Sequence, residues 1–184
     1  STLSTLAVAL TKIANDVRWL GSGPRSGLGE LDLPANEPGS SIMPGKVNPV
    51  IPEAVTQVAF AVAGADVTVS MAVEAGQLQL NAFEPIIAHS LFQSITWLER
   101  ACRTFRVNCV EGITANEAKL ADTVARSVTV ITALAPVIGY ASAAALAKEA
   151  LTGDARVADL VESRGLLEFG EIDALLTPSR LTGV

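Results

Sequence analysis

Long apolar stripes at helical spacing constrain the fold of this chain more than any other feature. Three segments repeat apolar residues at intervals of three and four, which is typical of helices that pack in a bundle. The stripes consist of Leu3, Leu6, Leu10, Ile13, Val17 and Leu20, of Ile51, Val55, Val58 and Val62, and of Ile87, Leu91, Ile95, Leu98, Cys102, Phe105 and Cys109. The sequence therefore predicts an all-α protein.

Two stretches allow other structures. Val67 to Met71 alternates apolar and polar residues as a strand would, but no second strand is evident, so we interpret it as a continuation of the preceding helix. Ser127 to Ala147 is a run of 21 residues without a charge. Pro136 and Gly139 interrupt this run, which therefore predicts two buried helices meeting at a turn rather than a membrane span.

The pattern changes near Gly112, where long stripes give way to short helical segments separated by glycines. We therefore expect two parts. Residues 1–112 form a long-helix bundle and residues 113–184 form a small helical domain. The chain also begins inside a helical pattern, as a piece of a longer polypeptide would.

Composition limits the partners. Apolar residues make up 49% of the chain and charged residues 17%, whereas about a quarter of an average protein is charged. So much apolar surface favours an obligate oligomer. The net charge of −6 argues against nucleic acid or an anionic membrane as partner. The two cysteines lack the spacing of a metal or redox motif, and no secretory signal is visible, so we expect a reducing compartment, the cytoplasm.

Residues 39–49, Gly-Ser-Ser-Ile-Met-Pro-Gly-Lys-Val-Asn-Pro, must form a loop, because their glycines and prolines exclude a helix or strand interior. Lys46 and Asn48 precede a helix, with Asn48 expected as its cap, and helix N-termini favour anions. Ser40 or Ser41 could act as a base only if loop amides and Lys46 stabilised its alkoxide. A flexible connector with a solvated lysine is the alternative.

Two other ionisable residues have ordinary explanations. His89 is the one histidine and lies among apolar residues of a predicted helix, so we interpret it as a packed or boundary residue rather than a general base. Glu53, taken alone, is an acidic residue favoured at a helix N-terminus.

The string at 39–49 resembles the signature loop of the fumarase/aspartase superfamily, and the match is long and ungapped. Its flanks, Gly23-Pro24-Arg25-Ser26-Gly27 and Val50-Ile51-Pro52-Glu53, are similar as well, the latter to the aspartate ammonia-lyase branch. Residues 75–81, Ala-Gly-Gln-Leu-Gln-Leu-Asn, also resemble that branch, although they suggest no chemical role. The resemblance covers the whole chain but only the C-terminal part of the family's polypeptide, where a segment of the central bundle is followed by a small helical domain.

The resemblance implies a role for each matched residue. Ser40 corresponds to the general base that removes a Cβ proton from L-aspartate. Ser41 would help hold the β-carboxylate as an aci-carboxylate, while Lys46 and Asn48 correspond to residues that bind the α-carboxylate. Glu53 corresponds to a glutamate that pairs with a histidine of another subunit. Ammonia would then leave to give fumarate, without a metal or organic cofactor.

The resemblance also implies an incomplete site. The family builds each active site from three regions of three subunits in a tetramer, and this chain contains one of those regions, so we expect it to be inactive alone. Fumarate hydratase, which eliminates water through the same intermediate, is the nearest alternative. A non-catalytic helical assembly fragment is an alternative of another class.

Overall fold

The computed structural model describes residues 2–23, 25–153 and 155–183, and it divides into two compact units, Ser1–Asn116 and Glu117–Val184. Helices dominate both units, which confirms the predicted all-α class. The division falls four residues after Gly112, where the sequence changes character. Residues 113–116 belong to the first unit because they pair with the segment that follows the first helix.

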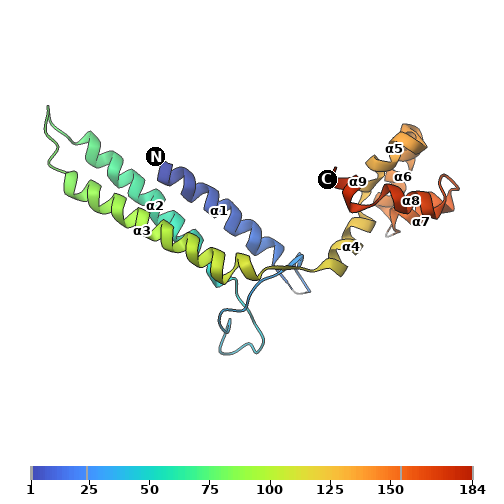
Figure 1. Cartoon of the computed structure of the whole chain (residues 1–184), viewed down its shortest axis with the longest axis horizontal. Helices are drawn as coiled ribbons and strands as arrows, with labels where there is room; N and C mark the ends of the chain where they lie inside the picture. The colour runs from blue at the N-terminus through green and yellow to red at the C-terminus, as the bar shows by residue number, and fades with distance from the viewer. Residues whose placement is uncertain (1, 24, 154, 184) are drawn as a thin grey trace. The chain divides into compact units, whose positions relative to one another are not determined.

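The first unit is a bundle of three long helices (Figure 1). They are α1 (Thr2–Leu20), α2 (Val50–Glu74) and α3 (Glu84–Asn108), and α2 packs against both of the others. The segment from Val67 to Met71 lies within α2, so its strand-like alternation does not produce a strand. Asn81 satisfies backbone groups between α2 and α3, since its side chain donates to the Ala72 carbonyl at 3.0 Å and accepts from the Phe83 N–H at 2.8 Å.

A short antiparallel pairing joins the chain that follows α1 to the chain that follows α3. β1 (Leu31–Asp32) pairs with β2 (Thr114–Ala115), with Leu31 opposite Ala115. The 3₁₀ turn η1 (Val110–Gly112) lies between α3 and β2. The Asn116 N–H donates to the Glu30 carbonyl at 2.9 Å beside this pairing. The chain between α1 and α2 is therefore anchored at β1 before it reaches residues 39–49.

The core of the first unit uses smaller side chains than the predicted stripes. Leu6 and Ile13 were expected to be buried, but they are 43% and 51% exposed, and Ala7 and Ala14 take the core positions instead. On α3, Ser90 and Ser94 are likewise buried. Small side chains let neighbouring helices approach closely, and this turns several large apolar residues outward. The core consists of Ala7, Leu10, Ala14, Val55, Ala59, Val62, Leu98, Ala101, Phe105 and Cys109.

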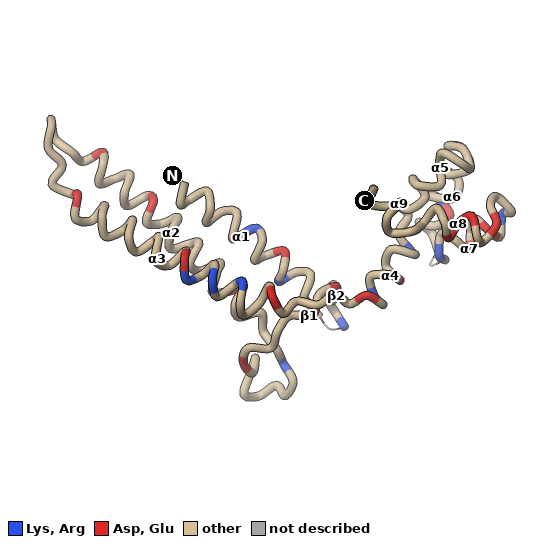
Figure 2. The backbone as a smooth tube through the Cα atoms, in the orientation of Figure 1, with Lys and Arg blue, Asp and Glu red and all other residues tan. Residues whose placement is uncertain are grey.

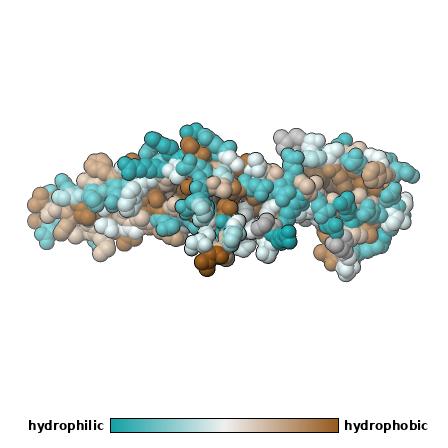
Figure 3. Space-filling view, turned by 90° about the horizontal axis from the view of Figure 1, so that it is seen from below, coloured by the Kyte–Doolittle hydropathy of each residue, from teal (hydrophilic) through white to brown (hydrophobic). Residues whose placement is uncertain are grey.

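The surface of the bundle is apolar and sparsely charged. Between residues 54 and 98 the charged side chains are Asp66, Glu74 and Glu84 (Figure 2). Phe60, Met71 and Phe92 are exposed, and apolar side chains reach the surface of the bundle (Figure 3). By length and composition alone α2 could span a membrane, as could the bent pair of α4 with residues 128–138, but core helices of soluble proteins pass the same test.

The second unit packs short helices around its own core. They are α4 (Glu117–Arg126), η2 (Val128–Val130), α5 (Ile131–Ile138), α6 (Tyr140–Thr152), α7 (Val157–Ser163), α8 (Phe169–Leu175) and α9 (Pro178–Thr182). Leu134, Leu146 and Val157 are fully buried.

The expected turn is found at Gly139, which joins α5 to α6 at φ +81°, a conformation that favours glycine. Pro136 was expected to interrupt the run, but it lies inside α5. Both helices are only partly buried, since Val137 and Tyr140 are exposed.

Candidate functional site

Hydrogen bonds close residues 39–49 into a loop with a narrow neck. The Gly39 N–H donates to the Lys46 carbonyl at 2.8 Å, and the Asn48 side-chain amide donates to the Gly39 carbonyl at 2.9 Å. We call Gly39, Lys46 and Asn48 the neck. A Cβ atom on residue 39 would lie 2.7 Å from the Lys46 carbonyl oxygen, so glycine is needed for this close approach.

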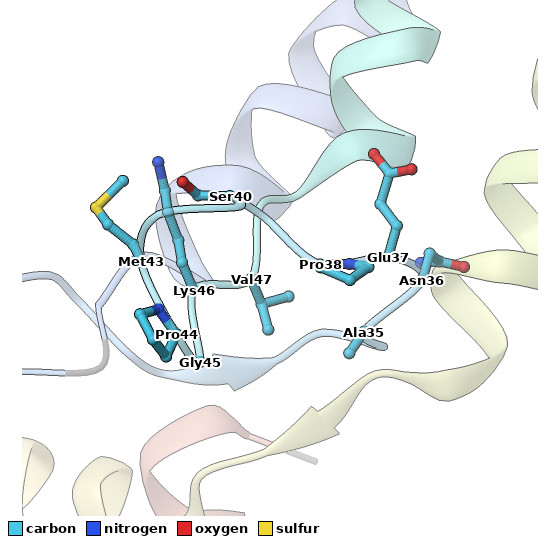
Figure 4. Close-up of a pocket in the computed structure, with 10 residues that line it drawn as sticks. All are labelled: Ala35, Asn36, Glu37, Pro38, Ser40, Met43, Pro44, Gly45, Lys46 and Val47. Atoms are coloured by element: carbon cyan, nitrogen blue, oxygen red, sulfur yellow. The ribbon is translucent and has the colours of Figure 1, made fainter.

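A cavity of about 480 Å³ lies against the loop and the chain that leads into it (Figure 4). Ser40, Met43 and Lys46 contribute from the loop, and Asn36 and Glu37 contribute from the preceding segment. The side chains of Ser40 and Lys46 point to the same side of the loop. The structure therefore places a hydroxyl and a cation at one concave surface, to which Glu37 also contributes a carboxylate.

Ser40 has an environment that Ser41 lacks. Its Oγ accepts a hydrogen bond from the Ile42 N–H at 3.2 Å, and the residue is half-buried beside the cavity. Ser41 is exposed and does not line the cavity. A backbone N–H directed at a serine oxygen stabilises negative charge on that oxygen. Of the two serines considered from the sequence, Ser40 is the one that lines the cavity.

The expected cap at Asn48 is wrong. α2 begins at Val50 with Pro49 at its N-cap position, and no side chain caps it. The Asn48 amide instead donates to Gly39, nine residues back. The side-chain nitrogen of Asn48 thus closes the loop as a donor, whereas a helix cap would have used the side-chain oxygen as an acceptor. Asn48 is half-buried, and its side-chain oxygen makes no hydrogen bond within the described part of the chain.

Glu53 lies in the first turn of α2, where it meets α1. The Arg18 Nη2 atom is 3.4 Å from Glu53 Oε1, and the two side chains are 39% and 38% exposed. Glu53 does not line the cavity. The predicted site residues therefore do not all meet at the cavity, and Ser41 is exposed away from it. Ser40 and Lys46 share the cavity, Asn48 closes the neck, and Glu53 faces α1.

Sequence reasoning missed two residues that support this region. The Asn36 side chain donates to the Pro34 carbonyl at 3.1 Å and to the Asn108 carbonyl at 3.0 Å. The second bond attaches the segment that precedes the loop to the end of α3. Arg18 contacts Glu53 across 35 residues of sequence. Neither contact has a local sequence signal. His89, expected as a packed or boundary residue, is exposed on α3.

Outside the loop, Asp122 and Cys109 are ionisable residues with shifted pKa values. Among the described residues, no group of three or more His, Cys, Asp or Glu side chains is placed to hold a metal ion. On α4, hydrogen bonds from Arg126 and from Arg156 to Asp122 lower the pKa of that carboxyl group below its usual value. Burial raises the pKa of the Cys109 thiol.

Comparison with known proteins gives consistent matches over both units. A family model described as "Lyase" matches residues 1–64, and one described as "Fumarase C C-terminus" matches residues 130–183. The chain is 52% identical to an aspartate ammonia-lyase of Helicobacter pylori over 179 residues, covering 97% of this chain and 38% of the relative. It is 49% identical to a class II fumarate hydratase of Chromobacterium violaceum over 176 residues, covering 96% of this chain and 38% of the relative.

Solved structures agree with these matches. The crystal structure of a fumarate lyase:delta crystallin from Brucella melitensis bound to cobalt superposes with a TM-score of 0.92 at 52% identity, covering 97% of this chain and 39% of that one. The chain thus spans less than two fifths of the length of its curated relatives.

Proposed function

Because the chain belongs to the fumarase/aspartase superfamily, we propose that the complete protein is an ammonia-lyase that converts L-aspartate to fumarate and ammonia. The observation that carries the proposal is the 39–49 loop, which presents Ser40 and Lys46 at one cavity. Similarity to aspartate ammonia-lyases at about half identity supports the choice of substrate.

The proposed chemistry begins at Ser40. Its alkoxide removes a proton from Cβ of aspartate, and the electron pair of that C–H bond moves into the β-carboxylate to form an aci-carboxylate. The electron pair then returns to form the double bond as the Cα–N bond breaks, and the protonated amino group leaves with the pair of that bond as neutral ammonia. Because a Cβ–H is only weakly acidic, the site must stabilise charge on the carboxylate oxygens. The Ile42 N–H, which already contacts Ser40 Oγ, favours the alkoxide.

The remaining residues have binding roles in this proposal. Lys46 and Asn48 hold the α-carboxylate, and Ser41 helps hold the β-carboxylate once the loop closes on substrate. Lys46 is exposed at the cavity, as a residue that recruits an anion should be. Glu53 pairs with an active-site histidine from another subunit. Positive charge and loop amides at the start of α2 suit a dicarboxylate.

A homotetramer assembled through the bundle would complete the site. The exposed apolar residues of α2 and α3, together with the scarcity of charge between residues 54 and 98, support burial of this surface against other subunits. The same composition and the two unpaired cysteines support a cytoplasmic location.

Fumarate hydratase is the second candidate, because a class II fumarate hydratase is nearly as similar to this chain as the ammonia-lyases are. Purified complete protein should be assayed for fumarate formation from L-aspartate and from L-malate, with ammonia release measured in parallel. We expect fumarate and ammonia in equal amounts from aspartate. Strong malate turnover without aspartate turnover would refute the proposal in favour of the hydratase.

A further inference from the structure

We propose that Arg18 is a positioning residue that holds the carboxylate of Glu53. The inference rests on the proposed function, which gives Glu53 its role. Arg18 occupies the last turn of α1 and Glu53 the first turn of α2, the helix that follows the 39–49 loop. Their side chains meet at 3.4 Å between Nη2 and Oε1.

The guanidinium group makes hydrogen bonds at two of its nitrogen atoms. Nη2 contacts Glu53 and Nη1 donates to Asn15 Oδ1 at 3.4 Å, while Nε is enclosed without a hydrogen-bond partner among the described residues. A guanidinium is planar, so bonds at two of its nitrogen atoms restrict its orientation. Glu53 is therefore approached from one defined direction, along the side of α1.

This contact leaves half of the carboxylate available. Arg18 engages Oε1, and the described residues provide no hydrogen bond to Oε2. A carboxylate held at one oxygen can accept a second donor at the other oxygen in a fixed orientation. That arrangement suits a glutamate that must orient the imidazole of another subunit.

The contact itself adds little stability. Both side chains are more than a third exposed, and solvent screens exposed ion pairs so that they contribute little to stability. Arg18 near the C-terminus of α1 and Glu53 near the N-terminus of α2 are each favourable to their own helix whether or not they touch. A role in orienting Glu53 therefore predicts a loss of turnover that is much larger than the loss of stability.

The test is a double-mutant cycle in the complete protein, with the variants R18M, E53Q and R18M together with E53Q. We expect R18M to lower kcat roughly tenfold to a hundredfold, as misplacement of a supporting group does, with KM changed little because Arg18 does not touch substrate. R103M, which removes the exposed pair between Arg103 and Glu99 on α3, is the matched control and should keep the wild-type kcat.

Non-additivity identifies the role. If Arg18 acts through Glu53, the double variant is no slower than E53Q alone. Losses that multiply, or an R18M kcat within about twofold of that of R103M, would overturn the inference. Thermal unfolding of each variant separates stability from turnover, and R18Q, which also removes the charge, carries the same test if R18M does not fold.

The outcome is distinguishable from failure of the proposed function. If the wild-type protein turns over malate instead of aspartate, the substrate assignment fails, and the cycle is measured with malate. If E53Q retains the full wild-type kcat, the role of Glu53 fails, and the positioning role of Arg18 is overturned with it.

Discussion

Gly39 and Lys46 close the neck of the 39–49 loop backbone to backbone, with the Gly39 N–H 2.8 Å from the Lys46 carbonyl oxygen. The Asn48 amide adds a second bond, to the Gly39 carbonyl at 2.9 Å. These bonds bring the two ends of the loop together and direct Ser40 and Lys46 to the same cavity.

Substitution of Gly39 by alanine should open the neck. The new Cβ would lie 2.7 Å from the Lys46 carbonyl oxygen and 3.1 Å from the Asn48 nitrogen, so the backbone must shift. We expect faster proteolysis within the loop and at least a tenfold lower kcat in the complete protein, because misplacement of about 1 Å can cost a hundredfold. Gly170→Ala, where a Cβ meets no atom within 4 Å, is the control. Equal proteolysis rates for the two variants would contradict the claim that glycine at residue 39 is needed to close the neck.

The two cysteines should react at different rates. Cys109 is buried, and burial raises the pKa of its thiol, which reduces the thiolate fraction near neutral pH. Cys102 is only partly buried. Alkylation of the folded chain, followed by mass spectrometry, should modify Cys102 first, and denaturant should remove the difference. If Cys109 were modified as fast as Cys102 in the folded chain, this core position would be accessible to the reagent and the prediction would be wrong.

Asp122 should make the second unit sensitive to acid. Hydrogen bonds from Arg126 and Arg156 lower the pKa of its carboxyl group below the ordinary 3.8. The ion pairs therefore stabilise the folded state fully above that value, and the contribution is lost as the pH falls through the lowered pKa. Asp122→Asn should be less stable than wild type near neutral pH and equal to it in strong acid. If denaturant unfolding gave the same stability difference between the two proteins at every pH, the predicted pH dependence would be contradicted.

Leu134 should be a major source of stability in the second unit. Its side chain is 0% exposed at the centre of that core. Leu134→Ala should lower the free energy of unfolding by about 2–5 kcal/mol through lost burial and a cavity. Val137→Ala is the matched control on α5, because Val137 is 56% exposed and should change stability by about 0.5 kcal/mol or less. Denaturant unfolding of both variants measures the difference.

Apolar periodicity predicted the long helices but not which face of each is buried. On α3, Ser90 and Ser94 are buried, whereas Leu91 and Ile95, which belong to the predicted apolar stripe, are exposed. A helix can bury apolar residues against its own chain or against another chain, and the sequence pattern does not distinguish these two kinds of surface. The core of a single chain is only one of these surfaces, and here it selects small residues that allow close packing.

Loop composition predicted the place of the candidate site but not its internal contacts. The glycines and prolines of residues 39–49 located the loop, and the structure brings Ser40 and Lys46 to one cavity. The local sequence does not reveal that Asn48 bonds to Gly39 instead of capping α2, because its side chain can donate through its nitrogen or accept through its oxygen. The contact between Arg18 and Glu53 depends on how α1 packs against α2, which no short motif encodes.

The most direct test of the account is the effect of Ser40→Ala on turnover in the complete protein. Loss of a general base typically costs about 10²–10⁴ in rate, so kcat with L-aspartate should fall by that factor while substrate binding changes little. Ser163→Ala, which removes a hydroxyl on α7 bonded to the Leu160 carbonyl, should retain the wild-type kcat. Near-normal turnover by the Ser40→Ala variant would contradict the assignment of Ser40 as the base.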